Sequence, residues 1–76
     1  MNIGPRVKEL RTSAGLSQQA AADRIGWSQS YWAAIERDRK TPGIDTVEKL
    51  ADVLDVTPAD LLRPAGARLL TKPEAK

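Results

Sequence analysis

The sequence predicts an all-α fold, a compact domain of five short helices. Apolar residues recur at helical spacing along most of the chain, and no segment shows the strict alternation expected of a β-strand. Breaks of two to about seven residues, marked by glycine, proline and capping residues, separate the helical segments. With 76 residues, the chain is expected to form one domain with a single modest core.

The first two predicted helices are defined by their spacing and by their end residues. Apolar residues, a proline in the first turn and a glycine at the C-cap mark the first helix: Ile3, Val7, Leu10 and Ala14, with Pro5 and Gly15. The second begins after Ser17, whose hydroxyl suits an N-cap, and ends at Gly26. Small and apolar residues lie inside it: Ala20, Ala21, Ala22 and Ile25.

Three more helices are predicted after Gly26. The third runs from Ser28, its N-cap, to about Arg37, and residues 38–43 form a loop that contains a Pro-Gly pair. The fourth is expected to begin at Asp45, because Asp45 and Glu48 have the spacing of a capping box. The fifth is short and begins with Thr57 as N-cap and Pro58 at the first helical position.

These helices predict one core and one domain, which spans residues 1–63. Residues 64–76, with two prolines, a glycine and mostly basic charges, are expected to form a flexible basic tail. The predicted core residues are Val7, Leu10, Leu16, Ala22, Ile25, Trp32, Ile35, Val47, Leu50, Ala51, Leu54, Val56 and Leu61.

The composition excludes several classes of function. The chain has no cysteine and no histidine, so disulfides, Cys or His metal sites and His general bases are absent. We therefore expect no enzyme, no metal and no cofactor. No apolar run approaches the length of about 18 residues that a membrane span needs, and no signal peptide is recognisable. These features predict a soluble, cytoplasmic protein without membrane contact.

Charge is unevenly distributed along the chain. Residues 1–40 carry seven basic and four acidic side chains, whereas residues 41–62 carry one basic and five acidic ones. Residues 63–76 again have a net charge of +3. Such segregation is typical of solvated surface, but it also fits one face that meets an anion and another that is turned away.

The second and third predicted helices have helix-turn-helix spacing. Counting from Gln18, the fifth residue is Ala22, which is small enough for two helices to approach closely. The ninth is Gly26, at a position that favours positive φ. The fifteenth and eighteenth are Trp32 and Ile35, which point into the core.

Over residues 3–62 the chain resembles the Cro/C1-type (XRE) helix-turn-helix regulators, which have a lambda-repressor-like fold. The resemblance rests on RVKELR (6–11), GLSQ (15–18), ADRIG (22–26), SQSYW (28–32), IER (35–37), Pro42 and Leu50-Ala51. It implies sequence-specific binding to double-stranded DNA, with residues 28–37 as the recognition helix in the major groove. Ala21, where the family usually has leucine, and Trp32, where it usually has isoleucine or valine, depart from the pattern and can compensate for each other in volume.

The resemblance assigns the polar face of the third helix to base reading. Gln29 is the main candidate, because a glutamine amide can pair with adenine N6 and N7. Ser30 can bind either type of base, and Ala33 and Ala34 can touch thymine methyl groups or only permit close approach. The expected phosphate-binding residues are Gln18, Ser28, Tyr31, Arg37, Arg39 and Lys40. For Tyr31 a half-buried surface position is the alternative, and Arg37 can instead reach a guanine.

Other residues are expected to have structural roles. In similar proteins the positions of Arg11 and Glu36 form an ion pair between the first and third helices. Gly26 makes the turn, and Trp27 and Trp32 stand at the two positions of a hydrophobic staple around the N-cap Ser28. These tryptophans are therefore expected to fix the angle of the recognition helix.

One such module offers a small DNA interface, so a homodimer on a near-palindromic operator is expected. Val56, Leu61 and Leu62 are the candidates for the dimer surface. The expected function is a transcriptional regulator, in the first instance a repressor and possibly of its own gene, encoded by a bacterium, phage or plasmid and nucleoid-associated when bound. A restriction–modification controller or an antitoxin fits the same class. The alternative is an antitoxin or a protein-interaction module with the same fold, whose C-terminal tail, at residues 67–70, binds a partner protein.

Overall fold

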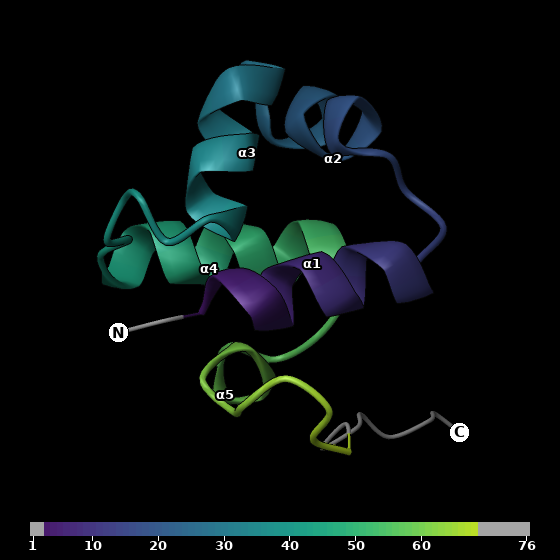
Figure 1. The fold of residues 1–76 in the computed structure, drawn as a ribbon, viewed down its shortest axis with the longest axis vertical. Helices are drawn as coiled ribbons and strands as arrows, with labels where there is room; N and C mark the ends of the chain where they lie inside the picture. Colours follow the sequence, from purple (N-terminus) through teal and green to yellow (C-terminus); the bar gives the residue numbers. More distant parts are fainter. Residues whose placement is uncertain (1–2, 69–76) are drawn as a thin grey trace.

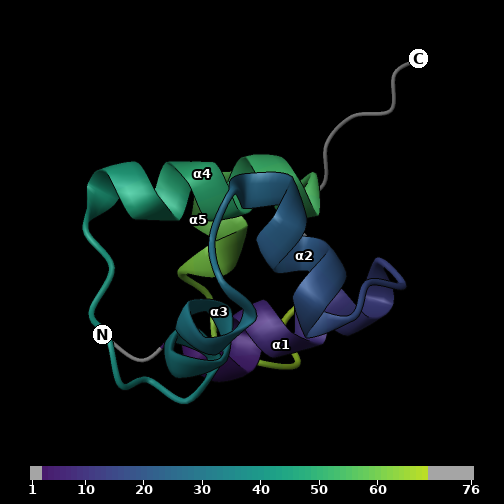
Figure 2. The same ribbon diagram turned by 90° about the horizontal axis from the view of Figure 1, so that it is seen from above.

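The computed structural model describes residues 3–68, and all its regular elements in this range are helices. They are α1 (Gly4–Ser13), α2 (Gln18–Ile25), α3 (Gln29–Glu36), α4 (Ile44–Leu54) and α5 (Pro58–Leu61). Figure 1 shows α2 and α3 on one side of α1 and α4, with α5 on the other. Seen from above, α2 and α3 stand over α1 and α4 (Figure 2). The all-α prediction is confirmed.

Side-chain caps begin three of the helices at the positions that the sequence predicts. The hydroxyl groups of Ser17, Ser28 and Thr57 accept hydrogen bonds from the amides three residues further on. Each cap satisfies one of the free N–H groups that a helix leaves at its first turn. The start of α2, which leads into the helix-turn-helix, and the start of α3 are therefore encoded locally.

The predicted N-cap of α4 is wrong by two residues. Gly43, not Asp45, is the N-cap, and it gives no side-chain hydrogen bond. The Gly43 carbonyl accepts from the Val47 amide at 2.9 Å and so closes the first helical turn. Glycine is an acceptable N-cap because its backbone adopts the required extended conformation easily. Asp45 then lies within the first turn, where its charge is favourable near the helix N-terminus.

Four helices end in the same way, with one residue in the left-handed conformation. At Gly15, Gly26, Asp38 and Asp55 φ is between 58° and 82°. In each case the next amide bonds back to a carbonyl five residues earlier, as in a Schellman motif. The glycine endings of α1 and α2 follow the sequence prediction, but the two aspartates carry no comparable signal.

The core confirms most of the predicted residues and adds two. Ten of them are buried, and Ile3 and Ala21 join them. Leu16, Ile25 and Val56 are only partly buried at its edge. Leu16 and Val56 directly follow left-handed residues, where an apolar side chain commonly packs back onto the end of the preceding helix. No described helix is long and apolar enough to cross a bilayer.

Candidate nucleic-acid interface

Aromatic packing fixes the start of α3. The rings of Trp27 and Trp32 lie 6.0 Å apart, as expected for a hydrophobic staple around Ser28. Trp27 also meets Tyr31 in an edge-on contact with a centroid distance of 4.7 Å. Trp32 has no exposed surface, so it belongs to the core. The tryptophans thus hold α3 in place.

Tyr31 lies at the edge of the core. Its side chain is half-buried, and its ring packs on Trp27 and on the edge of the core. This agrees with the half-buried surface position that the sequence also allows. A role of the Tyr31 hydroxyl in binding phosphate stays a prediction.

The outer face of α3 is small and polar. Gln29 and Ser30 are exposed, and Ala33 and Ala34 are half-buried beside them. Arg37, the C-cap of the helix, is exposed on the same side. Because Ala33 and Ala34 are short, no bulky side chain prevents this face from approaching another surface closely.

At the C-terminal end of α3, the Glu36 carboxylate joins three helices. Arg11 of α1 donates from Nε to Glu36 Oε2 at 2.5 Å and from Nη2 to Oε1 at 3.3 Å. Trp32 Nε1 donates to Oε2 at 2.6 Å, and Gln18 Nε2 of α2 donates to Oε1 at 2.9 Å. The structure therefore forms the ion pair that the family resemblance implied, and it adds two donors that the sequence did not suggest.

These donors decide the charge state of Glu36. Burial raises the pKa of its carboxyl, but the hydrogen bonds from Arg11, Gln18 and Trp32 outweigh this effect. The pKa of Glu36 is thus held below its ordinary value, and the group is ionised at neutral pH. A buried carboxylate with this many donors fixes the relative positions of α1, α2 and α3.

Gln18 is engaged by both ends of its amide. Besides the bond to Glu36, its Oε1 accepts from Gln29 Nε2 at 2.8 Å. The sequence predicts phosphate binding for Gln18 and base reading for Gln29, as separate roles. The structure brings these two side chains together at the surface.

The basic side chains at the end of α3 lie next to a tightly closed helix end. Asp38 adopts a φ of 60°, and its Oδ1 accepts from the Gly4 amide at 2.8 Å. A Cβ atom on Gly4 would lie 2.3 Å from the Glu36 carbonyl oxygen, so only glycine permits this contact between α1 and α3. Arg37 before Asp38, and Arg39 and Lys40 after it, are exposed. The sequence signal for Gly4 and Asp38 is weak, because neither lies in the helix-turn-helix.

On another side of α1, Arg6 is buried together with Asp60. Arg6 Nε donates to the Asp60 carbonyl at 2.9 Å, and Nη1 donates to the Ala67 carbonyl at 2.8 Å and to Glu9 at 3.0 Å. The Gly66 amide donates to the Glu9 carboxylate, and this bond and Arg6 hold the pKa of Glu9 below its ordinary value. Gly66 and Ala67 thereby contact α1. The rest of the predicted tail, with Leu69 and Leu70 of its partner-binding segment, lies outside the described residues.

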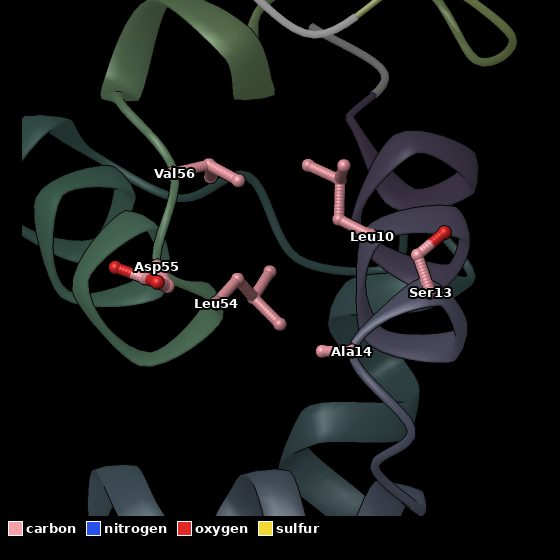
Figure 3. Close-up of a pocket in the computed structure, with 6 residues that line it drawn as sticks. All are labelled: Leu10, Ser13, Ala14, Leu54, Asp55 and Val56. Atoms are coloured by element: carbon pink, nitrogen blue, oxygen red, sulfur yellow. The ribbon is translucent and has the colours of Figure 1, made fainter. Parts of the chain in front are cut away.

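One predicted dimerisation residue is in the wrong place. Leu61 has no exposed surface, because the short α5 turns it toward the core. Leu62, the next residue, is 53% exposed, and Val56 is half-buried. Figure 3 shows Val56 and Leu54 facing Leu10 across an open groove between α1 and the α4–α5 turn.

Among the described residues, no group of three or more acidic side chains is placed to hold a metal ion. The exposed side of α2 and α3 instead offers amides, hydroxyl groups and guanidinium groups. These are the groups that contact bases and phosphates in nucleic-acid interfaces. The fold and this surface define a helix-turn-helix domain.

Comparisons with known proteins agree with this assignment. A family model described as a helix-turn-helix domain matches residues 2–64. The uncharacterized HTH-type transcriptional regulator y4dJ of Sinorhizobium fredii is 36% identical over 62 residues, which cover 82% of this chain and 80% of y4dJ. The HTH-type transcriptional regulator SinR of Bacillus subtilis is 41% identical over 61 residues. That match covers 79% of this chain and 55% of SinR, so the chain spans about half of SinR.

A solved structure supports the same conclusion. The restriction-modification controller protein C.AhdI of Aeromonas hydrophila has a TM-score of 0.75 and 38% identity to this chain, covering 80% of this chain and 92% of its own. The chain belongs to the helix-turn-helix family and is of the Cro/C1 type, as the sequence predicts. This is a family of DNA-binding transcriptional regulators and not of enzymes.

Proposed function

We propose that this chain binds double-stranded DNA in a sequence-specific manner, with α3 in the major groove, and acts as a dimeric transcriptional repressor. The observation that carries the proposal is the exposed face of α3. Its first residue, Gln29, presents an amide already held by Gln18, and the residues beside it are small. An α-helix fits the major groove when its outward side chains are of this kind.

Within this proposal Gln29 reads one base pair and the cations bind the backbone. Gln29 pairs with adenine, Ser30 makes a less selective contact, and Ala33 and Ala34 allow approach to thymine methyl groups. Arg37, Arg39 and Lys40 neutralise phosphates. The free backbone N–H groups at the starts of α2 and α3, together with the polar groups of Gln18 and Ser28 there, bind phosphate oxygens by hydrogen bonds. The protein acts on the bacterial nucleoid, whether a chromosome, a plasmid or a phage encodes it.

The proposed dimer uses the side of the molecule around the α4–α5 turn. Leu62 is the exposed apolar residue there, and Val56 adds a half-buried side chain. Two copies related by a two-fold axis place two α3 helices on half-sites about one helical turn apart, which calls for a near-palindromic operator. A dimer also doubles an interface that is small for a single module.

DNA binding is tested by titrating the protein with random duplex and then by selecting preferred sequences from a random pool. Affinity for random duplex should fall steeply between low and moderate salt, because phosphate contacts release counterions. Gln29→Ala should weaken selection at one base pair per half-site by about 5- to 100-fold. Gln19→Ala is the matched control, because Gln19 is exposed on α2 and its amide bonds to Asp23. Absent or salt-insensitive binding to duplex would overturn the proposal and favour a protein-interaction module.

The dimer is tested separately by sedimentation. Leu62→Asp should shift the protein toward the monomer and weaken operator binding, because a charge in an apolar interface is costly. Ile44→Asp is the control, since Ile44 is the other large exposed apolar residue, at 74% exposure, and begins α4. Equal behaviour of the two variants would place the interface elsewhere.

A further inference from the structure

The open groove between α1 and the α4–α5 turn has the size and chemistry of a site for aliphatic side chains (Figure 3). Four apolar and two polar residues form its walls: Leu10, Ser13, Ala14, Leu54, Asp55 and Val56. The volume of the groove is about 240 Å³. A cavity of about 150 Å³ already holds a benzene ring, so this groove has room for one or two aliphatic side chains.

The segment that follows α5 is fastened to α1 beside this groove. The Gly66 amide donates to the Glu9 carboxylate at 2.8 Å, and the Ala67 carbonyl accepts from Arg6 Nη1 at 2.8 Å. A turn brings the segment back to α1, because the Ala67 amide donates to the Pro64 carbonyl at 3.1 Å and Gly66 has a φ of 87°. Since Arg6 is buried, one of these two attachments comes from the interior of the domain.

The attachment and the groove lie on the same face of α1. Leu10 follows Arg6 by four residues, and Ser13 follows Glu9 by four. Residues four positions apart stand one above the other on a helix, about 5.4 Å along its axis. The groove therefore begins one helical turn beyond the residues that hold the segment.

The next residues of the chain are within reach of the groove. Leu69 and Leu70 follow Ala67 by two and three residues. An extended chain covers about 3.3 Å per residue, so these leucines can lie up to about 7 to 10 Å from Ala67. This reach exceeds one turn of α1. Both leucines can therefore enter the groove while the bonds to Glu9 and Arg6 stay in place.

The charge of the segment also matches the charge around the groove. Asp55, in the groove wall, is exposed, and residues 41–62 carry five acidic side chains against one basic one. The two leucines stand between Arg68 and Lys72, in a stretch, residues 63–76, with a net charge of +3. Apolar side chains flanked by cations are complementary to an apolar groove with an acidic edge.

We propose that Leu69 and Leu70 of the same copy fill this groove, so that the chain covers its own apolar surface between α1 and the α4–α5 turn. This inference goes beyond DNA binding and does not depend on it. A partner that uses the groove, including a second copy through Val56, must first displace the two leucines. Leu62 does not belong to the groove wall and stays exposed for the proposed dimer.

The first test detects the contact in the full chain by nuclear magnetic resonance. The methyl groups of Leu69 and Leu70 should show nuclear Overhauser effects to those of Leu10, Leu54 and Val56. In a mixture of isotope-labelled and unlabelled copies, these effects should be absent between the two kinds of copy. Effects between different copies would mean that a second copy fills the groove, and no effects in either sample would mean that it stays open. Either result would overturn the proposal.

The second test measures how fast trypsin cleaves the full chain after Arg68. Cleavage needs a released tail, so its rate follows the fraction of molecules in which the leucines are undocked. Leu69→Asn combined with Leu70→Asn should speed this cleavage by about 5- to 30-fold, because burial of leucine stabilises the docked state. Ala75→Asn, a polar substitution further along the tail, is the matched control and should leave the rate unchanged. Equal rates for wild type and the leucine variant would contradict docking.

A substitution in the groove separates docking from a change in the cleaved sequence. Val56→Asn alters the groove wall, leaves residues 63–76 as they are and should also speed cleavage after Arg68. Ile44→Asn is its control, because Ile44 is 74% exposed at the other end of α4. Circular dichroism checks that each variant is folded. If Val56→Asn does not fold, the leucine variant and the methyl contacts decide. Protection of wild type that disappears on dilution would assign the groove to a second copy and overturn the proposal.

Discussion

Two buried charges, Glu36 of α3 and Arg6 of α1, organise this small domain in different ways. Glu36 is an anion that receives side-chain donors from α1, α2 and α3. Arg6 is a cation that donates to the backbone carbonyls of Asp60 and Ala67. The first therefore orients side chains near the proposed DNA surface. The second fixes the course of the backbone at α5 and beyond.

The two charges also differ in how well they are satisfied. Both oxygens of Glu36 accept hydrogen bonds, whereas Arg6 Nη2 has no hydrogen-bond partner and lies 3.8 Å from Asp60 Oδ1. A buried charge that is tied to the backbone is costly to remove, because its partners remain behind in the interior. We therefore expect substitutions of Arg6 and of residues around Glu36 to change the stability of the protein by different amounts.

The largest expected effect is on the Arg6 side. Arg6→Met should lower the free energy of unfolding by about 3–5 kcal/mol, because the buried Asp60 carboxylate would lose its cation. Urea unfolding measures this loss. Arg24→Met, at an exposed position of α2, should change stability by less than about 0.5 kcal/mol. A loss below about 1 kcal/mol for Arg6→Met would mean that Arg6 does not organise this side.

A second effect concerns the backbone contact that accompanies the Glu36 network. Gly4→Ala should cost about 1–3 kcal/mol, because its Cβ would press on the Glu36 carbonyl and push α1 away from α3. Thermal unfolding should then show a drop of several degrees. Gly43→Ala is the control, since a Cβ there meets nothing within 4 Å. It should cost less than about 1 kcal/mol as an altered N-cap. Equal losses would contradict the close contact.

A third, smaller effect is the response to acid. Since the pKa of Glu36 is lower in the folded protein, its contribution to stability is complete above the ordinary glutamate pKa of about 4.3. That contribution is lost as the pH falls through the lower folded value. Wild type should therefore lose more stability on acidification than Glu36→Gln, measured by urea unfolding from neutral to acidic pH. Glu9 titrates in both proteins, so parallel curves would rule out the Glu36 contribution.

The smallest effect compares the two aspartates in the left-handed conformation. Asp55→Gly should stabilise the protein by up to about 1 kcal/mol, because glycine adopts positive φ without strain. Asp38→Gly should gain less or lose stability, because Asp38 Oδ1 accepts from the Gly4 amide. Melting temperatures of the two variants measure the difference. A gain at Asp38 equal to that at Asp55 would show that the bond to Gly4 contributes nothing.

Much of the fold follows from local signals in the sequence. Helical spacing, the hydroxyl caps Ser17, Ser28 and Thr57, and the glycines after α1 and α2 predicted the elements and most of the core. The N-cap of α4 was wrong by two residues because Gly43 caps without a side chain, and the Asp45–Glu48 spacing imitates a capping box. Such errors arise where two local patterns compete within one turn of helix.

The candidate site was predictable by residue but not by arrangement. The spacing of the helix-turn-helix indicates Gln18 and Gln29, and the resemblance to Cro/C1-type regulators indicates Arg11 and Glu36. Neither the spacing nor the resemblance shows that Gln18 links Gln29 to Glu36, or that Trp32 donates to the same carboxylate. Leu61 failed as a dimerisation residue because the direction of a side chain in a four-residue helix depends on what packs beneath it.

The sequence by itself determined the helices, the hydroxyl caps of α2, α3 and α5, the staple of Trp27 and Trp32 and the identity of the exposed residues on α3, because these depend on neighbours a few positions away. Only the tertiary structure decided which polar groups meet: Glu36 with Gln18, Arg6 with Ala67, and Gly4 with Asp38. These pairs are separated by 18 to 61 residues in the chain. Their contact depends on how the helices pack, since a buried polar group must find its partner in the same interior.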